Sequence, residues 1–250
     1  MNVSKHTLPV IFLLLTFLFS NIALAVTYSC KQHGKTFSTT LSGVGAGGFN
    51  VINTNCSTLI DNHWNNFGME KEYWDDGLGF NNVCSVDTQL NRTFRALELL
   101  RISKNTNLNS DVALNFAYDF SKNAINHLRA SCAGNAENSF GAGYLEGNAY
   151  LYQNAFGSSI MWLSATVLHE ARHKQKSHNL DKDCPRKASC DNSYEYDGAN
   201  AYELAYSWWY GLHGNRSTKF TRQMGLDNAR RLQNTAFNQR PGFNIHTTAQ

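Results

Sequence analysis

The sequence predicts an α+β domain that is rich in helices, contains a small sheet and is stabilised by disulfides. Three observations carry this prediction. Apolar residues recur at helical spacing in several segments between residues 87 and 232, as in amphipathic helices that cover a core. Two segments, residues 26–56 and 141–156, have the composition and turn residues of short strands. Six cysteines, an even number, follow an N-terminal segment typical of exported proteins.

The first 25 residues predict a secretory signal peptide. A weakly basic start at Lys5 precedes an apolar stretch from Leu8 to Phe19, and Ala23 to Ala25 form a small-residue cleavage site. We expect the mature chain to begin near Val26 and to be secreted or periplasmic. Residues 26–250 are expected to form a single domain, because no internal repeat or linker divides them.

The charge balance argues against two classes of partner. The net charge is +3 for the whole chain, and removal of Lys5 with the signal peptide leaves +2. No basic run of five or more residues occurs, so we expect no binding to nucleic acid or to an anionic membrane. No further segment is long enough for membrane insertion after signal removal. We expect a monomer.

The N-terminal half of the mature chain is predicted to contain strands and then helices. Residues 26–56, rich in Thr, Ser and Gly, are expected to form short strands around a flexible turn. A poor helical period covers Leu59 to Trp74. A better helix is expected from a cap at Asp87 to about Ser103, and a clearer one from Asp111 to Ala130.

The C-terminal half is predicted to begin with a strand and a turn over Gly141 to Phe156. A helix with Ser158 or Ser159 as its N-cap is expected to follow, up to about Lys176. The remaining helices are expected over Gly198 to Gly211 and over Thr218 to Leu232.

The helix expected from Ser159 carries His169, Glu170 and His173 in the pattern HExxH. Four residues turn a helix by about 400°, so the two imidazoles project from one face. This spacing allows two neutral imidazoles to bind Zn²⁺, and Glu170 lies close enough to take a proton from a metal-bound water. About 0.01 such patterns are expected by chance in this composition. The apolar residues before His169 indicate a buried helix, so we predict a zinc site rather than an ordinary surface helix.

The segment from His169 to His173, with its apolar lead-in, resembles the zincin metallopeptidases. The resemblance extends loosely over the next thirty residues and implies a zincin-like fold. It also implies a zinc-dependent peptidase in which His169 and His173 bind Zn²⁺ and Glu170 activates the water that attacks a peptide or protein substrate. In zincins an edge strand near the active helix binds the extended substrate, and by analogy we place residues 141–156 there. Zincins usually have uncharged residues where this chain has Arg172 and Lys174. We interpret Arg172 as a solvated cation near the helix C-terminus, with orientation of a nearby carboxylate as the alternative.

Catalytic zinc usually has three protein ligands, and the sequence offers several candidates for the third. We favour His178, although its segment is one residue shorter than the metzincin pattern HExxHxxGxxH and lacks the Gly. On a continued helix His178 would point about 140° away from His173, so it can bind only if the helix ends first. Glu203 is the rival, because gluzincins take their third ligand from a Glu on a downstream helix. Asp191, which faintly resembles the aspzincin ligand, and Asp197 are weaker options.

The sequence allows more than one oxyanion donor, more than one function and more than one disulfide pairing. A tyrosine from residues 194–210, or His213, is expected to stabilise the oxyanion. The chain could instead be a catalytically inactive zincin-like metal-binding or interaction protein, or a disulfide-built adhesin with a chance motif. Cys184 and Cys190 flank a short loop, where we expect a disulfide with each other or to the body of the domain. The full set of cysteines is Cys30, Cys56, Cys84, Cys132, Cys184 and Cys190.

Overall fold

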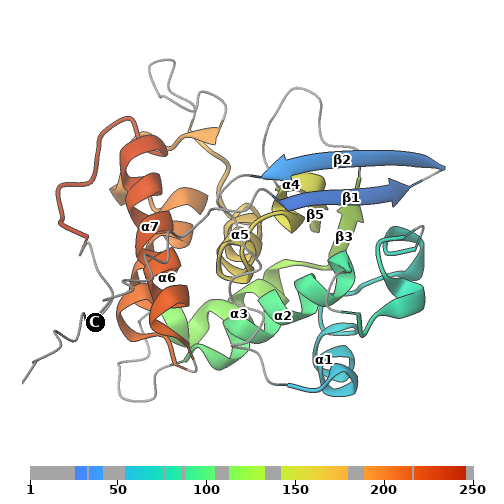
Figure 1. Ribbon diagram of the computed structural model, residues 1–250. Coiled ribbons are helices and arrows are strands. Elements are labelled where there is room, and N and C mark those ends of the chain that lie inside the picture. The colour runs from blue at the N-terminus through green and yellow to red at the C-terminus, as the bar shows by residue number, and fades with distance from the viewer. Residues whose placement is uncertain are drawn as a thin grey trace, which may run out of the picture.

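Helix α5, Ile160–Arg172, lies at the centre of the structure and contacts both the other large helices and the main sheet (Figure 1). The computed structural model describes residues 26–32, 34–41, 54–75, 77–85, 88–104, 113–132, 142–179, 189–215 and 217–245. Over these residues the chain is helix-rich α+β, as predicted. The predicted signal peptide lies outside the described residues.

The sequence of α5 accounts for where this helix begins and ends. Ser159 is the N-cap, and its hydroxyl accepts a hydrogen bond from the Trp162 amide at 3.2 Å. Apart from the partly buried Trp162, the apolar residues that follow are fully buried, which holds the helix in the core. The helix ends at Arg172, four residues before the predicted end, because residues 174–177 are mainly exposed polar residues with no apolar face to bury.

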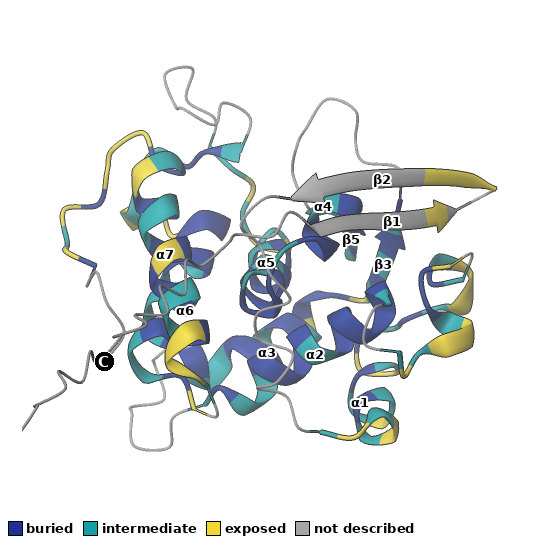
Figure 2. Ribbon diagram, in the orientation of Figure 1, coloured by how far each residue is buried: buried dark blue, intermediate teal, exposed yellow. Residues whose placement is uncertain are grey.

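Two helices, α2, Gln89–Ile102, and α3, Ala113–Ala124, pack against α5. A shorter helix, α1, Cys56–His63, packs against α2. Their facing sides are buried (Figure 2). The largest side chains of this core include Phe67, Trp74, Leu90, Phe94, Leu97, Leu100 and Phe156.

Two of the predicted helices in this region have different bounds. The helix expected over Leu59 to Trp74 is the shorter α1, followed by a turn of 3-10 helix, η2, at Lys71–Tyr73. Asp87 lies outside the described residues, and Thr88 is the N-cap of α2, accepting from the Asn91 amide at 3.2 Å. A second short 3-10 turn, η3, at Phe80–Asn82 precedes it.

The helix expected up to Ala130 is wrong in its last part. After α3 the chain enters strand β3, His127–Ser131, which pairs in parallel with β5, Asn148–Tyr152. Leu128 lies four residues after Ala124 and so continues the helical stripe, but Leu128 and Ala130 face the core at a spacing of two, as in a strand. Pairing with β5 decides in favour of the strand.

The main sheet has the order β3-β5-β4, with β4, Ala142–Leu145, at one edge and antiparallel to β5. Glu146 and Gly147 both have positive φ in the turn that joins β4 to β5, as a tight hairpin requires. This hairpin confirms the strand and turn predicted over residues 141–156 for residues 142–152. A short helix, α4 at Gln153–Phe156, follows β5.

A separate hairpin confirms the strands predicted in residues 26–56. Strand β1, Val26–Gln32, pairs antiparallel with β2, Lys35–Leu41, and both contact α4. The Gly-rich segment from Ser42 to Gly48 lies outside the described residues.

The C-terminal part packs two long helices together against α5. They are α6, Ala199–His213, and α7, Lys219–Thr235, the latter with a capping box between Thr218 and Thr221. Their contact depends on Gly225, where a Cβ atom would lie 2.7 Å from the Ser207 carbonyl oxygen. Both helices confirm the predicted ones and extend them by a few residues. A short 3-10 turn, η5 at Tyr194–Tyr196, leads into α6.

Disulfides hold the described chain at several places. Cys56 at the start of α1 is bonded to Cys84 before α2, and Cys132 and Cys190 are also disulfide-bonded. The bonding of Cys190 agrees with a disulfide near the loop after α5, whereas Cys184 lies outside the described residues. None of the helices that the structure describes has the length and apolar character needed to cross a membrane.

Candidate metal centre

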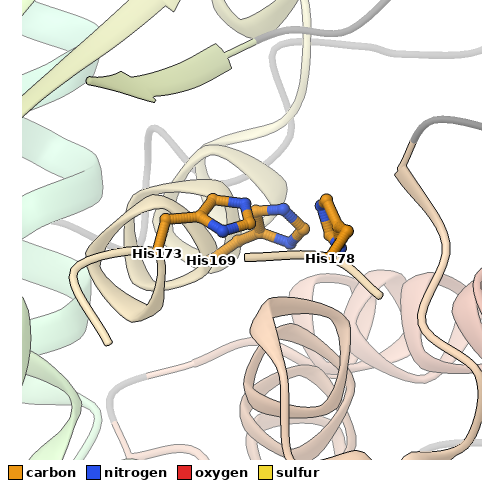
Figure 3. A group of neighbouring side chains, drawn as sticks. All are labelled: His169, His173 and His178. Carbon is orange, nitrogen blue, oxygen red and sulfur yellow. The ribbon is translucent and has the colours of Figure 1, made fainter. Parts of the chain in front are cut away.

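Three histidine side chains converge beside the C-terminal end of α5 (Figure 3). His169 and His173 come from the helix and its C-cap, and His178 comes from the segment that follows. Each offers a ring nitrogen, and these atoms all lie within 4.8 Å of one another. The ring centroids are 4.6 to 5.2 Å apart. Three imidazoles this close could form a metal-binding site.

The end of α5 explains how His178 reaches the other two. Because the helix stops at Arg172, the chain turns back and does not carry His178 to the opposite face. Two hydrogen bonds fix this return segment. Tyr196 Oη donates to the Ser177 carbonyl oxygen at 2.8 Å, and the Asn192 amide donates to Asn179 Oδ1 at 2.7 Å.

Each of the three imidazoles has an oxygen beside its Nδ1 atom. His173 Nδ1 lies 3.0 Å from the Lys176 carbonyl oxygen, and His178 Nδ1 lies 2.9 Å from Asp191 Oδ1. His169 Nδ1 lies 3.0 Å from Glu203 Oε2, without the geometry of a full hydrogen bond. An Nδ1–H that faces an oxygen leaves Nε2 as the free metal-binding atom, and such partners are typical of metal-binding histidines.

The surroundings of the helix histidines favour the form that binds metals. Burial, together with the neighbouring His169 and His178, lowers the pKa of His173 to about 3. Burial also lowers the pKa of His169, against the opposing effect of Glu203. Both rings are therefore neutral at neutral pH, as metal ligation requires.

Glu170 is a buried carboxylate whose second oxygen lacks a hydrogen bond. Its exposed fraction is 4%, and Oε2 has no hydrogen-bond partner among the described residues. Burial and the nearby Glu203 carboxylate raise the pKa of Glu170 to about 8. A buried carboxylate is costly without a positive charge or a donor nearby, and a bound divalent cation would supply the charge. This orphaned oxygen beside three imidazoles fits a metal centre.

The carboxylates considered as third ligands lie behind the histidines instead. Glu203 on α6 contacts Nδ1 of His169, and Asp191 contacts Nδ1 of His178. Neither belongs to the group of atoms that could share one ion, which consists of His169, His173 and His178 within the described residues. Asp197 pairs with Arg172 instead, at 2.9 Å.

The interpretation of Arg172 as a solvated cation is wrong. Its exposed fraction is 6%, and its guanidinium donates to the carbonyl oxygen and Oδ2 of Asp197. It also lies 4.4 Å from the ring centroid of Tyr202. Arg172 is buried because the segment that enters α6 folds back over the end of α5. Arg172 therefore orients the carboxylate of Asp197, which agrees with the alternative interpretation. Lys174 is exposed and donates to the Asn123 carbonyl oxygen.

Comparison with known proteins adds no evidence on the identity of the site. No protein-family model, curated protein or solved structure matches the chain.

Three of the five tyrosines in residues 194–210, the region expected to stabilise an oxyanion, are engaged elsewhere. Tyr206 and Tyr210 are fully buried in the core, and Tyr194 packs against Phe237 and Phe243. The His213 ring packs against Trp209, about 15 Å along α6 from Glu203 at the rise of an α-helix.

Tyr152 at the end of β5, a strand that contacts α5, is a candidate that sequence reasoning missed. Burial raises the pKa of Tyr152, and the charges of Glu170 and Tyr150 raise it further. Its hydroxyl lies over the backbone of Gly143 on β4, where a Cβ atom would approach it to 3.3 Å. The alternation of β5 indicated that Tyr150 and Tyr152 share a face. That alternation does not show that β5 lies beside α5 in the fold.

Proposed function

We propose that this protein is an exported zinc-dependent hydrolase of zincin-like fold that cleaves peptides or proteins. One observation carries the proposal: His169, His173 and His178 converge next to Glu170, a buried carboxylate with an unpartnered oxygen. Three histidines are a donor set of catalytic zinc, which keeps a further position for water. The disulfides are in keeping with export to an oxidising compartment.

The residues of the site have complementary roles in this hydrolysis. His169, His173 and His178 would hold Zn²⁺, which would lower the pKa of water and polarise a carbonyl group. The cation would also favour the ionised form of Glu170, which takes a proton from the attacking water and passes it to the leaving amine. The neutral Tyr152 hydroxyl donates a hydrogen bond to the oxyanion.

Strand β4 supports a peptide as the substrate. It is an edge strand of the main sheet and contacts α5, the helix of the HExxH motif. An edge strand offers unpaired amides and carbonyls to an extended peptide, which adds as a further strand. Leu145 on β4 is 61% exposed and could contact an apolar side chain of that peptide.

Proteolysis by wild-type protein and by Glu170→Gln tests this proposal. Both proteins are loaded with Zn²⁺ and incubated with a denatured protein substrate, and new N-termini are counted. We expect the wild type to cleave, and we expect Glu170→Gln to retain zinc with turnover lower by about a hundredfold or more, since general-base catalysis contributes about 10² to 10⁴. A zinc-loaded wild type that cleaves no substrate would instead support the inactive metal-binding alternative.

A further inference from the structure

We infer that Arg231 and Asn228 of α7 are positioning residues for the metal centre, acting through Glu203 on His169. Helix α7 supplies none of the three histidines, yet it contacts the carboxylate behind one of them. The inference rests on the proposed function in one respect, which is that His169 binds a metal ion.

The Glu203 carboxylate is contacted on both of its oxygens. Oε2 lies 3.0 Å from His169 Nδ1. Oε1 accepts a hydrogen bond from Asn228 Nδ2 at 3.2 Å and lies 3.4 Å from Arg231 Nη2. The side of Glu203 that faces away from His169 is therefore fixed by two residues one turn apart on α7.

The two α7 residues also hold each other in place. Arg231 donates to Asn228 Oδ1 from Nη2 at 2.6 Å and from Nε at 3.1 Å. Asn228 is fully buried and donates to Ser207 Oγ at 2.8 Å. The Arg231 guanidinium lies 5.2 Å from the ring centroid of Trp162 on α5. This network ties α7 to α5 and α6 at the Glu203 carboxylate.

The charge of Arg231 offsets the cost of burying Glu203, whose exposed fraction is 7%. With that charge and the Asn228 amide in place, the carboxylate keeps its position behind His169. Partners of this kind orient a ligating histidine and raise its basicity, and their loss typically weakens metal binding by about 10- to 100-fold. Arg231 acts one contact further out, so we expect an effect near the lower limit.

The test measures the Zn²⁺ dissociation constant by competition with a chromophoric chelator. The variants are Arg231→Gln, Arg231→Met and Arg231→Lys. The matched control is Arg230→Gln, because Arg230 is the adjacent residue, has the same side-chain exposure of 31%, and pairs with Asp227 instead of Glu203. Arg231→Met keeps an apolar stem against Trp162 and removes only the charged head.

We expect Arg231→Gln and Arg231→Met to weaken Zn²⁺ binding by about tenfold, in line with the loss of an outer partner. Arg231→Lys should restore part of the affinity, and Arg230→Gln should match the wild type. In the Co²⁺-loaded proteins, the visible spectrum should change for the two neutral Arg231 variants and not for the control. Melting temperatures of the metal-free proteins show whether each variant is folded.

Two results would overturn the inference, and only the second would also overturn the proposed function. If a folded neutral variant of Arg231 binds Zn²⁺ as tightly as Arg230→Gln, Arg231 has no positioning role, while the proposed metal centre stands. If the wild type binds no Zn²⁺, the proposed function fails and the positioning role fails with it.

Discussion

His178 Nδ1 lies 2.9 Å from Oδ1 of Asp191, a carboxylate with no exposure to solvent. The other oxygen of Asp191 accepts from the Asn200 amide at the start of α6, at 3.2 Å. The backbone of Asp191 pairs with residues beyond α7 through the bridge to Phe237. The third histidine of the group is therefore held by residues far along the chain, and these residues determine whether it can bind a metal.

Asp191→Asn tests this support. The amide keeps the shape of the side chain but removes its charge, so we expect Zn²⁺ binding to weaken by about 10- to 100-fold. Chelator competition measures the effect, and Asp227→Asn on the exposed side of α7 is the control. An unchanged dissociation constant for Asp191→Asn would show that this carboxylate does not support the site.

His178→Ala decides between the two candidates for the third ligand. Removal of a ligand should abolish stable Zn²⁺ binding, whereas Glu203→Gln, which alters a residue behind His169, should still bind one ion with lower affinity. Zinc content after gel filtration distinguishes these outcomes. His127→Ala on β3, a half-exposed histidine away from the group, is the control. The opposite ranking of His178→Ala and Glu203→Gln would make Glu203 the ligand.

Tyr152→Phe removes the hydroxyl expected to donate to the oxyanion. We predict a fall in kcat of about a hundredfold with little change in KM or in zinc content, as found when one such donor is lost. Tyr150→Phe, on the same face of β5, is the matched control. Equal kcat values for the two variants would remove Tyr152 from the mechanism.

His63 and Glu98 form a fully buried pair away from the histidine group, with Nε2 and Oε2 3.0 Å apart. Burial alone would raise the pKa of Glu98, but hydrogen bonds from His63, Arg101 and Thr54 lower it to about 2. Burial lowers the pKa of His63, although Glu98 opposes this. A fall in pH therefore lowers stability through both groups, because each group binds its proton at a higher pH in the unfolded chain than in the folded one.

The free energy of unfolding should decrease in acid as a result. The His63 contribution is lost as the pH falls below the ordinary value of 6.5, and the Glu98 contribution is lost as it falls from 4.5 towards 2. Glu98→Gln should lower stability at pH 7 by about 3 kcal/mol and flatten this dependence below pH 5. Urea titrations from pH 3 to 7 measure both effects. Glu72→Gln, on an exposed turn, should leave the curve unchanged.

The parts of the site that depend on local spacing were predictable from the sequence. His169 and His173 share a helix face because they are four residues apart, and Ser159 marks the start of that helix by its capping hydroxyl. The requirement that the helix end before His178 was also readable, and α5 ends at Arg172.

The parts that depend on tertiary contacts were not predictable. Glu203 and Asp191 stood out as carboxylates, but only the packing of α6 and the return segment shows that they lie behind the histidines. Leu128 fits the helical stripe that precedes it as well as a strand, and the pairing of β3 with β5 decides the outcome. Arg172 became buried because a distant segment covers it.

Zinc content measured by elemental analysis tests the central claim most directly. The protein is purified without chelators, and wild type is compared with His169→Ala, His173→Ala and His178→Ala. The account predicts about one Zn²⁺ per wild-type chain and almost none in the three variants, since each removes one of three ligands. Wild-type protein that contains no zinc, or variants that keep it, would contradict the account.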